Sequence, residues 1–159
     1  MAITLFFSCI LLYILFSISI EDSKTMLISE NKLIMFAISG LCYLMLSGLS
    51  NDISNIINLL LYNSFSMIII FTMMYLISYI SFEIFEINSL GIGDIKLSSI
   101  STIWLGIEFC FLSLCISFLL SAIYGLHGKI SKKLNPFQQY PFAPFLSIGI
   151  FSSWIIDKI

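Results

Sequence analysis

Long apolar runs separated by short polar segments dominate the chain. Five clear runs and one weaker, shorter run are present: Ile3–Ile20, Leu33–Ser50, Ser64–Phe82, Ile107–Leu126, Pro141–Ile156 and, as the weaker one, Gly91–Gly106. A helix crosses the hydrocarbon layer of about 30 Å with about 20 residues, because it rises 1.5 Å per residue. The pattern therefore predicts an all-α, polytopic membrane protein with about six transmembrane helices. Ile56–Leu61 extends the third run beyond one crossing, either as an interfacial segment or as a longer, tilted helix.

Composition supports a lipid-facing exterior. Of the 159 residues, 59% are hydrophobic and 10% are charged, whereas soluble domains contain about 25% charged residues. We expect a single transmembrane domain over residues 1–159, in contact with membrane lipid. No basic stripe interleaved with aromatic residues occurs, so nucleic-acid binding has no support. The oligomeric state is open.

The cysteines and the single histidine suggest no cofactor or metal. Cys9, Cys42, Cys110 and Cys115 all fall within predicted spans and form no C-x-x-C pair. We expect them to be buried apolar thiols. His127 is expected at the edge of a polar loop over Leu126–Tyr140 and has no assigned role.

The lysines predict which ends of the spans share one side of the membrane. Six of the seven fall between spans one and two, at the start of span four, or between spans five and six: Lys24, Lys32, Lys96, Lys129, Lys132 and Lys133. Lysine-rich loops stay in the cytoplasm. Only Lys158 departs from this pattern. Each span carries the chain to the other side of the membrane. Asp22, after span one, and Asp94, at the start of span four, therefore both lie on the cytoplasmic side.

Asp22 and Asp94 are the candidate catalytic residues. Asp94 lies in Gly91-Ile92-Gly93-Asp94-Ile95-Lys96, just before an apolar run. The glycines permit close backbone approach and unusual dihedral angles, and a helix N-terminus stabilises a carboxylate. A simple N-capping aspartate is the alternative interpretation. Two close carboxylates do not both ionise readily, so one can act as a base and the other as an acid.

Four segments resemble motifs of the type IV prepilin peptidases, the GxGD aspartyl proteases also called leader peptidases. They are Asp22-Ser23-Lys24 with Ile28-Ser29, Gly91-Ile92-Gly93-Asp94-Ile95-Lys96-Leu97, Trp104-Leu105-Gly106, and Pro141-Phe142-Ala143-Pro144-Phe145-Leu146. The resemblance implies catalysis by Asp22 and Asp94. Gly91, Gly93, Lys96, Lys24, Pro141 and Pro144 would support the motifs.

The resemblance also implies a substrate and a location. The expected substrate is a prepilin or pseudopilin, whose short basic leader is cut at the cytoplasmic face of the bacterial inner membrane. No cofactor is implied. The chain is similar to short, peptidase-only members, because it begins at the first peptidase helix and lacks the paired C-x-x-C zinc sites of the bifunctional forms.

Three auxiliary positions depart from the family pattern. Ser29 replaces the usual proline, and Glu30 or Asn31 follows it; Asn88 replaces a frequent glutamate, and Ala143 replaces a glycine. An inactive relative therefore remains an alternative. A non-enzymatic membrane component of a pilus or secretion apparatus is another. A presenilin-like protease also shares G-x-G-D but has more helices than 159 residues allow.

Overall fold

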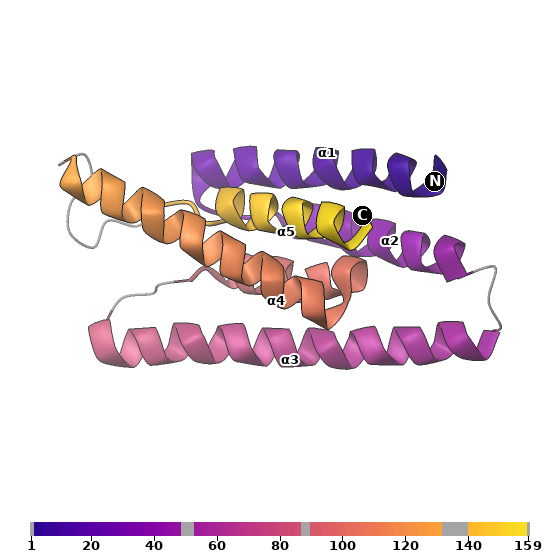
Figure 1. The fold of residues 1–159 in the computed structure, drawn as a ribbon. Helices are drawn as coiled ribbons and strands as arrows, with labels where there is room; N and C mark the ends of the chain where they lie inside the picture. Colours follow the sequence, from indigo (N-terminus) through magenta and orange to yellow (C-terminus); the bar gives the residue numbers. More distant parts are fainter. Residues whose placement is uncertain (1, 49–52, 87–89, 132–139, 159) are drawn as a thin grey trace.

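The computed structural model describes residues 2–48, 53–86, 90–131 and 140–158, and over these ranges it contains helices and no strand. In chain order the helices are α1 (Ala2–Thr25), α2 (Glu30–Gly48), α3 (Ile53–Phe85), α4 (Ile92–Ile130) and α5 (Ala143–Lys158) (Figure 1). The all-α prediction is confirmed. The predicted loop at Asn51-Asp52, the position of Asn88, and Lys132 and Lys133 lie outside the described residues.

The α4 helix reverses direction at Gly106. This glycine has φ 71° and ψ 176°, which are not helical. Beyond it, Cys110 Sγ lies 3.3 Å from Ser101 Oγ and 3.5 Å from the Ser98 carbonyl oxygen. In a straight helix, residues nine apart are separated by about 14 Å. The first segment of α4 (92–105) and its second segment (107–130) therefore lie side by side, and they correspond to two of the predicted spans.

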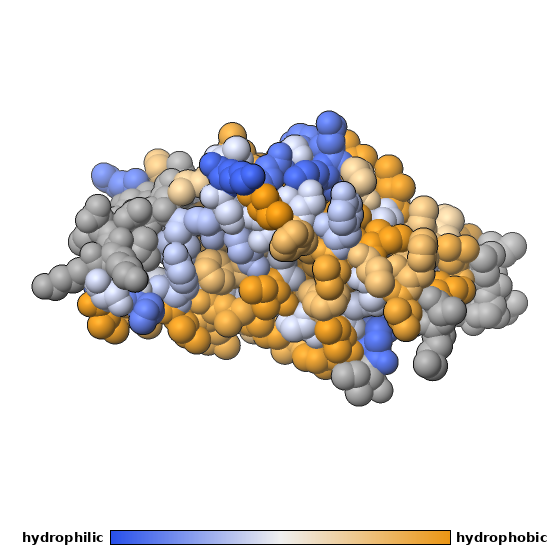
Figure 2. Space-filling view, turned by 90° about the horizontal axis from the view of Figure 1, so that it is seen from above, coloured by the Kyte–Doolittle hydropathy of each residue, from blue (hydrophilic) through white to orange (hydrophobic). Residues whose placement is uncertain are grey.

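In the parts of the chain that the structure describes, three helices are long and apolar enough to cross a membrane: Ile3–Thr25, Ile57–Ile84 and Ile92–Ile130. They indicate a membrane protein. Six spans are not shown: α2 has 19 residues and α5 has 16, and Ile92–Ile130 contains the reversal. Large apolar side chains face outward, including Tyr13 at 69% exposure and Phe65 at 65%. Figure 2 shows hydrophobic residues over much of one face.

The α3 helix explains the predicted run that was too long for one crossing. It continues without interruption for 33 residues, so Ile56–Leu61 lengthens this helix rather than forming a separate interfacial segment. At 1.5 Å per residue its length is about 50 Å. Its buried residues, Asn63, Ser66, Ile70 and Met74, recur every three or four positions and form one stripe. Most of the other side chains between 57 and 84 are exposed.

An aromatic cluster joins α1, α2, α4 and α5. It consists of Phe7, Phe36, Tyr43, Trp104 and Trp154. The Trp104 ring stacks on Phe36 and Tyr43 at centroid distances of 5.9 and 5.8 Å, and Trp154 meets it edge-on at 5.5 Å. The indole N–H of Trp104 also donates to the Phe36 carbonyl oxygen at 3.0 Å. These contacts fix the first segment of α4 against α2.

Close backbone approach holds α5 against the second segment of α4. A Cβ atom at Gly149 would lie 2.1 Å from Ser117 Oγ and 2.3 Å from the Ser113 carbonyl oxygen. Only glycine permits this distance. Small residues allow membrane helices to approach in this way, and the resulting van der Waals contact stabilises their packing.

Two expectations for the thiols and the polar loop were wrong. Cys110 is buried, but Cys9, Cys42 and Cys115 are exposed. They lie on helix faces that point away from the core, where an apolar thiol suits lipid contact as well as packing. The second segment of α4 continues to Ile130, so His127 is an exposed helical residue rather than a loop residue.

Several helix ends lie together at one end of the molecule. The C-terminal ends of α1, α3 and α4 and the N-terminal ends of α2, α4 and α5 lie on the left in Figure 1, whereas the chain termini lie toward the right. This left-hand end carries both candidate aspartates, one on α1 and one on α4. We call it the aspartate end.

Candidate active site

Asp22 lies in the last turns of α1. The predicted apolar run stops at Ile20, but the helix continues to Thr25. The next residue, Met26, has a φ of 53°, which is not helical, and its N–H donates to the Asp22 carbonyl oxygen at 2.8 Å. Asp22 is therefore fixed on a rigid helical turn rather than on a loop.

The Asp22 side chain is buried and faces the start of α5. It is 4% exposed, and its Oδ2 accepts a hydrogen bond from the Ala143 backbone N–H at 3.0 Å. Ala143 is the first residue of α5. The first N–H groups of a helix have no partner within the helix and carry partial positive charge. The start of α5 therefore stabilises a carboxylate at this position.

The local sequence at the start of α5 suits this contact. Pro144 is the second residue of the helix, where no N–H is needed and the proline ring fits. The Phe142 carbonyl oxygen accepts from the N–H groups of Phe145 and Leu146 at 3.0 and 3.1 Å. The Ala143 N–H is left for Asp22. The two prolines, Pro141 and Pro144, flank this short segment and restrict its backbone.

Asp94 lies in the first turn of α4, three residues after the N-cap residue Gly91. It is thus not the N-capping residue that the alternative interpretation supposed. The side chain is 7% exposed, and Oδ1 has no hydrogen-bond partner among the described residues. A buried carboxylate oxygen without a partner costs free energy, so such atoms are rare in folded proteins.

The two glycines of the Asp94 motif permit close approach rather than unusual dihedral angles. Gly91 has φ −71° and ψ 147°, which any residue adopts. Among the described residues only Gly106 is a glycine with positive φ. A Cβ atom at Gly93, however, would lie 3.1 Å from the Ile28 Cβ. Gly93 therefore lets the segment between α1 and α2 pack onto the start of α4.

Asp22 and Asp94 line one cavity of about 310 Å³. The other lining residues come from the α1–α2 connection, the start of α2 and the start of α4: Met26, Leu27, Ile28, Glu30, Leu33, Gly91, Ile92, Gly93 and Lys96. The charge of Asp22 acts electrostatically on Asp94. Residues 72 positions apart in the sequence thus present two buried carboxyl groups to the same space.

Lys96 and Lys24, the two lysines of the predicted motifs, differ in their surroundings. Lys96 lines the cavity and forms an ion pair with Glu30, which joins α4 to α2. Lys24 is exposed and takes part in none of the ion pairs found in the described ranges. The structure therefore brings Lys96 into the site but leaves Lys24 outside it.

A second polar cluster at the aspartate end was missed by the sequence analysis. Glu21 Oε2 accepts hydrogen bonds from the Ser29 N–H and Oγ at 3.3 and 3.1 Å and pairs with Lys32 at 3.3 Å. Lys32 also donates to the Ser17 carbonyl oxygen at 2.8 Å. Ser29, considered only as a departure from a proline, thus ties the end of α1 to the start of α2. The charge pair Glu21 and Lys32 was the only sequence signal for it.

The parts of the chain that the structure describes contain no group of side chains suited to bind a metal ion. There, no three histidine, cysteine, aspartate or glutamate side chains gather closely enough to hold an ion. The site instead consists of two carboxyl groups in one cavity, next to the N-terminal ends of two helices. This set can activate a water molecule by proton transfer, because a carboxylate can accept a proton while a carboxylic acid donates one.

Comparison with known proteins gives one match. Residues 9–126, about three quarters of the chain, match the profile of the type IV leader peptidase family. The matched range contains both aspartates and the Trp104-Leu105-Gly106 segment, and it ends before the start of α5. No curated protein and no solved structure matched this chain.

Proposed function

Because this chain belongs to the type IV leader peptidase family, we propose that it is an aspartyl endopeptidase that removes the short basic leader of type IV prepilins or pseudopilins. Membership of the family makes it a peptidase whose substrate is a precursor protein. Asp22 and Asp94 would carry the catalysis. The observation that supports this assignment best is that both carboxyl groups are buried in one cavity.

The chemistry proposed for the pair needs one proton shared between two carboxyl groups. In the low-dielectric cavity two neighbouring negative charges repel each other, so the singly protonated pair is favoured. The ionised carboxylate removes a proton from a water molecule, whose oxygen then attacks the carbonyl carbon of the substrate peptide bond. The protonated partner gives its proton to the carbonyl oxygen as the tetrahedral intermediate forms. The carboxyl group that took the water proton then passes it to the amide nitrogen, and the C–N bond breaks to release the amine and the carboxylic acid.

The contacts of the two side chains fit these roles. The Ala143 N–H holds Asp22 Oδ2 in a fixed direction. Asp94 Oδ1 has no hydrogen-bond partner among the described residues and is available to bond a water molecule or a substrate carbonyl. A buried oxygen atom without a hydrogen-bond partner in the protein is expected where a bound substrate or water molecule supplies that hydrogen bond.

We further propose that the aspartate end faces the cytoplasm in the bacterial inner membrane. Lys24 lies near the end of α1, Lys32 and Lys96 lie in the first turns of α2 and α4, and Lys129 lies in the last turn of the second segment of α4. Lys158, the exception, lies at the end of α5. Lysine-rich segments favour the cytoplasmic side. A leader awaiting removal would meet the site there.

Co-expression with candidate pilins tests the activity. Pilins encoded in the same genome would be produced with the wild-type protein or with Asp94→Asn, and the mass of the pilin N-terminus would be measured. We expect the leader to be removed by the wild type and retained with Asp94→Asn. Glu108→Gln is a matched control, because Glu108 is an exposed acid on the second segment of α4, outside the cavity. Leader removal that continues with Asp94→Asn would exclude the aspartyl mechanism.

A further inference from the structure

Residues 26–28, which connect α1 to α2, form one wall of the cavity that holds the two aspartates. Met26, Leu27 and Ile28 all line that cavity. Met26 and Leu27 are 54% and 73% exposed, so packing contributes little to holding them. Met26 has a φ of 53°, which is uncommon for a residue with a side chain. Packing and backbone preference therefore leave most of this wall to be held by other contacts.

Polar contacts at the two ends of the connection hold the wall. At its start, the Leu27 N–H donates to Thr25 Oγ1 at 3.3 Å. At its end, the Ser29 N–H and Oγ donate to Glu21 Oε2 at 3.3 and 3.1 Å, and Lys32 Nζ lies 3.3 Å from the same oxygen atom. Hydrogen bonds to an ionised group are stronger than those between neutral groups. Three donors from the far end of the connection thus converge on one carboxylate oxygen of α1.

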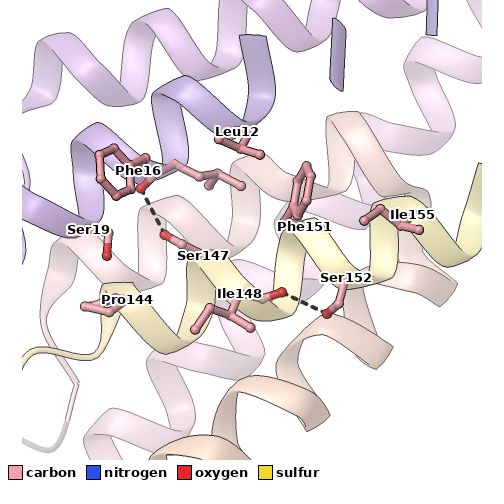
Figure 3. A pocket seen from close by; sticks show the side chains of 10 residues that line it. Leu12, Phe16, Ser19, Pro144, Ser147, Ile148, Phe151, Ser152 and Ile155 are labelled. Carbon is pink, nitrogen blue, oxygen red and sulfur yellow. Dashed lines mark hydrogen bonds between the residues drawn. The ribbon is translucent and has the colours of Figure 1, made fainter. Parts of the chain in front are cut away.

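Glu21 is a fixed anchor, because α5 binds the same part of α1. Ser147 Oγ donates to the Leu15 carbonyl oxygen at 3.3 Å, and Figure 3 shows this side chain directed from α5 toward α1. The Ala143 N–H donates to Asp22 Oδ2 at 3.0 Å. The contacts of Glu21 therefore fix the connection relative to the helix that carries Asp22.

Glu21 and Asp22 are neighbours in the sequence but face different parts of the molecule. Consecutive residues of a helix point about 100° apart. Asp22 lines the cavity, whereas Glu21, Ser29 and Lys32 do not. The Glu21 carboxylate thus holds the connection from outside the cavity and is not placed to act on a substrate inside it.

The wall also contacts the helix that carries Asp94. A Cβ atom at Gly93 would lie 3.1 Å from the Ile28 Cβ, so Ile28 packs against the residue that precedes Asp94. A shift of residues 26–28 would therefore change the cavity beside both carboxyl groups.

We propose that Glu21 is a positioning residue for the catalytic pair: through Ser29 and Lys32 it holds residues 26–28 against the cavity, so that a bound peptide bond stays aligned with the two carboxyl groups. The inference rests on the proposed function and deepens it. Misplacing a bound group by about 1 Å can cost about 100-fold in rate. Glu21 acts on this alignment and takes no part in proton transfer.

Steady-state kinetics of leader removal tests the role of Glu21. Glu21→Ala removes the acceptor of all three contacts, so we expect kcat to fall at least about tenfold and KM to change less than about threefold. Glu21→Gln keeps an acceptor for Ser29 and should lose less than about threefold in kcat. Glu83→Ala is a matched control with the wild-type kcat, because Glu83 is an exposed acid near the end of α3, outside the cavity.

Hydrogen exchange of the purified protein, followed by mass spectrometry, tests the position of the wall without a substrate. We expect the amides of residues 26–29 to exchange at least about tenfold faster in Glu21→Ala than in the wild type, and at the wild-type rate in Glu83→Ala. The midpoint of thermal unfolding should change little, because a partly exposed ion pair contributes little to stability. Ser29→Ala removes one of the three donors and should shift kcat and exchange in the same directions, which keeps the test available if Glu21→Ala does not fold.

The results separate this inference from the proposed function. If the wild type removes no leader, the proposed function fails, and the inference fails with it. If the wild type removes the leader, but the folded Glu21→Ala and Ser29→Ala variants keep the wild-type kcat or the wild-type exchange, only the positioning role fails. A large fall in the thermal midpoint in all the Glu21 and Ser29 variants would assign Glu21 to the stability of the fold and would also overturn the proposal.

Discussion

The aspartate end and the aromatic cluster differ in whether their buried polar atoms have hydrogen-bond partners. In the aromatic cluster each indole N–H has a partner: Trp104 donates to the Phe36 carbonyl oxygen at 3.0 Å, and Trp154 donates to Ser8 Oγ at 2.8 Å. At the aspartate end, Asp94 Oδ1 is buried without a partner in the described parts of the chain. The aspartate end also contains a cavity of about 310 Å³, so the two regions differ in packing as well as in hydrogen bonding.

The comparison indicates which region stabilises the fold and which performs chemistry. A buried polar atom without a hydrogen bond costs about 1–3 kcal/mol. Such a cost persists where a function requires the group. We therefore expect substitutions in the aromatic cluster to change stability, and substitutions of the aspartates to change activity with little loss of stability.

The largest expected effect is on activity. In Asp94→Asn the shape of the side chain is kept, but the carboxyl group that shares the proton is lost. We expect the rate of leader removal by the purified protein to fall at least about 10³-fold. The midpoint of thermal unfolding in detergent should stay the same or rise, because a costly buried carboxyl group is removed.

Glu30→Gln is the control for Asp94→Asn, because Glu30 lines the same cavity but is exposed. It should keep a rate within about tenfold of the wild type. If Asp94→Asn unfolds as readily as a variant of the aromatic cluster, Asp94 has a structural role and the contrast between the two regions is lost.

The next largest effect is on stability. Trp104→Ala removes the stacking on Phe36 and Tyr43, the indole hydrogen bond and a large buried volume. We expect the free energy of unfolding to fall by about 3–5 kcal/mol, as measured by denaturant titration in mixed micelles. Trp104→Phe should cost less, because an aromatic ring still stacks there. An unchanged free energy of unfolding in Trp104→Ala would contradict the role given to the cluster.

These two regions also show what could be predicted from the sequence. The apolar runs predict the helices, because a helix that faces lipid needs a long apolar segment. The lysine positions, together with the alternating direction of successive spans, predict that Asp22 and Asp94 lie on the same side of the membrane. The end of the run Gly91–Gly106 and the start of the run Ile107–Leu126 predict a boundary at Gly106, and the structure shows the reversal there.

The contacts of the site could not be predicted in the same way. The bond from Ala143 to Asp22 joins residues 121 positions apart, and no periodicity along the chain encodes such a distance. The fit of Gly93 against Ile28 likewise depends on how two segments approach in space. Unusual dihedral angles were predicted at Gly91 and Gly93, whereas the structure has a positive φ at Gly106. The sequence does not distinguish a glycine required for its conformation from one required for the space it leaves.

A smaller effect is expected at the reversal of α4. Gly106 has φ 71° and ψ 176°, a combination that is essentially restricted to glycine, and nothing lies within 4 Å of a Cβ atom placed there. Gly106→Ala should therefore cost about 1–3 kcal/mol through backbone strain alone. Gly40→Ala is a useful contrast, because its Cβ would meet the Trp104 ring. If Gly106→Ala is as stable as the wild type, the reversal does not need a glycine.

The smallest effect is expected for the ion pair between Lys96 and Glu30, which is exposed on both sides. Exposed pairs contribute about 0–1 kcal/mol. Lys96→Ala should therefore lower the free energy of unfolding by less than about 1 kcal/mol, and the difference should shrink in high salt. A loss as large as that of Trp104→Ala would show that Lys96 holds α4 in place.

The most direct test of the catalytic pair compares purified Asp22→Asn, Asp94→Asn and the double variant in vesicles, with leader removal followed by mass analysis of the prepilin N-terminus. If the two carboxyl groups act as one unit, each single variant loses as much activity as the double variant, because either change removes the shared proton. A single variant that still removes the leader at a rate close to that of the wild type would contradict catalysis by the pair.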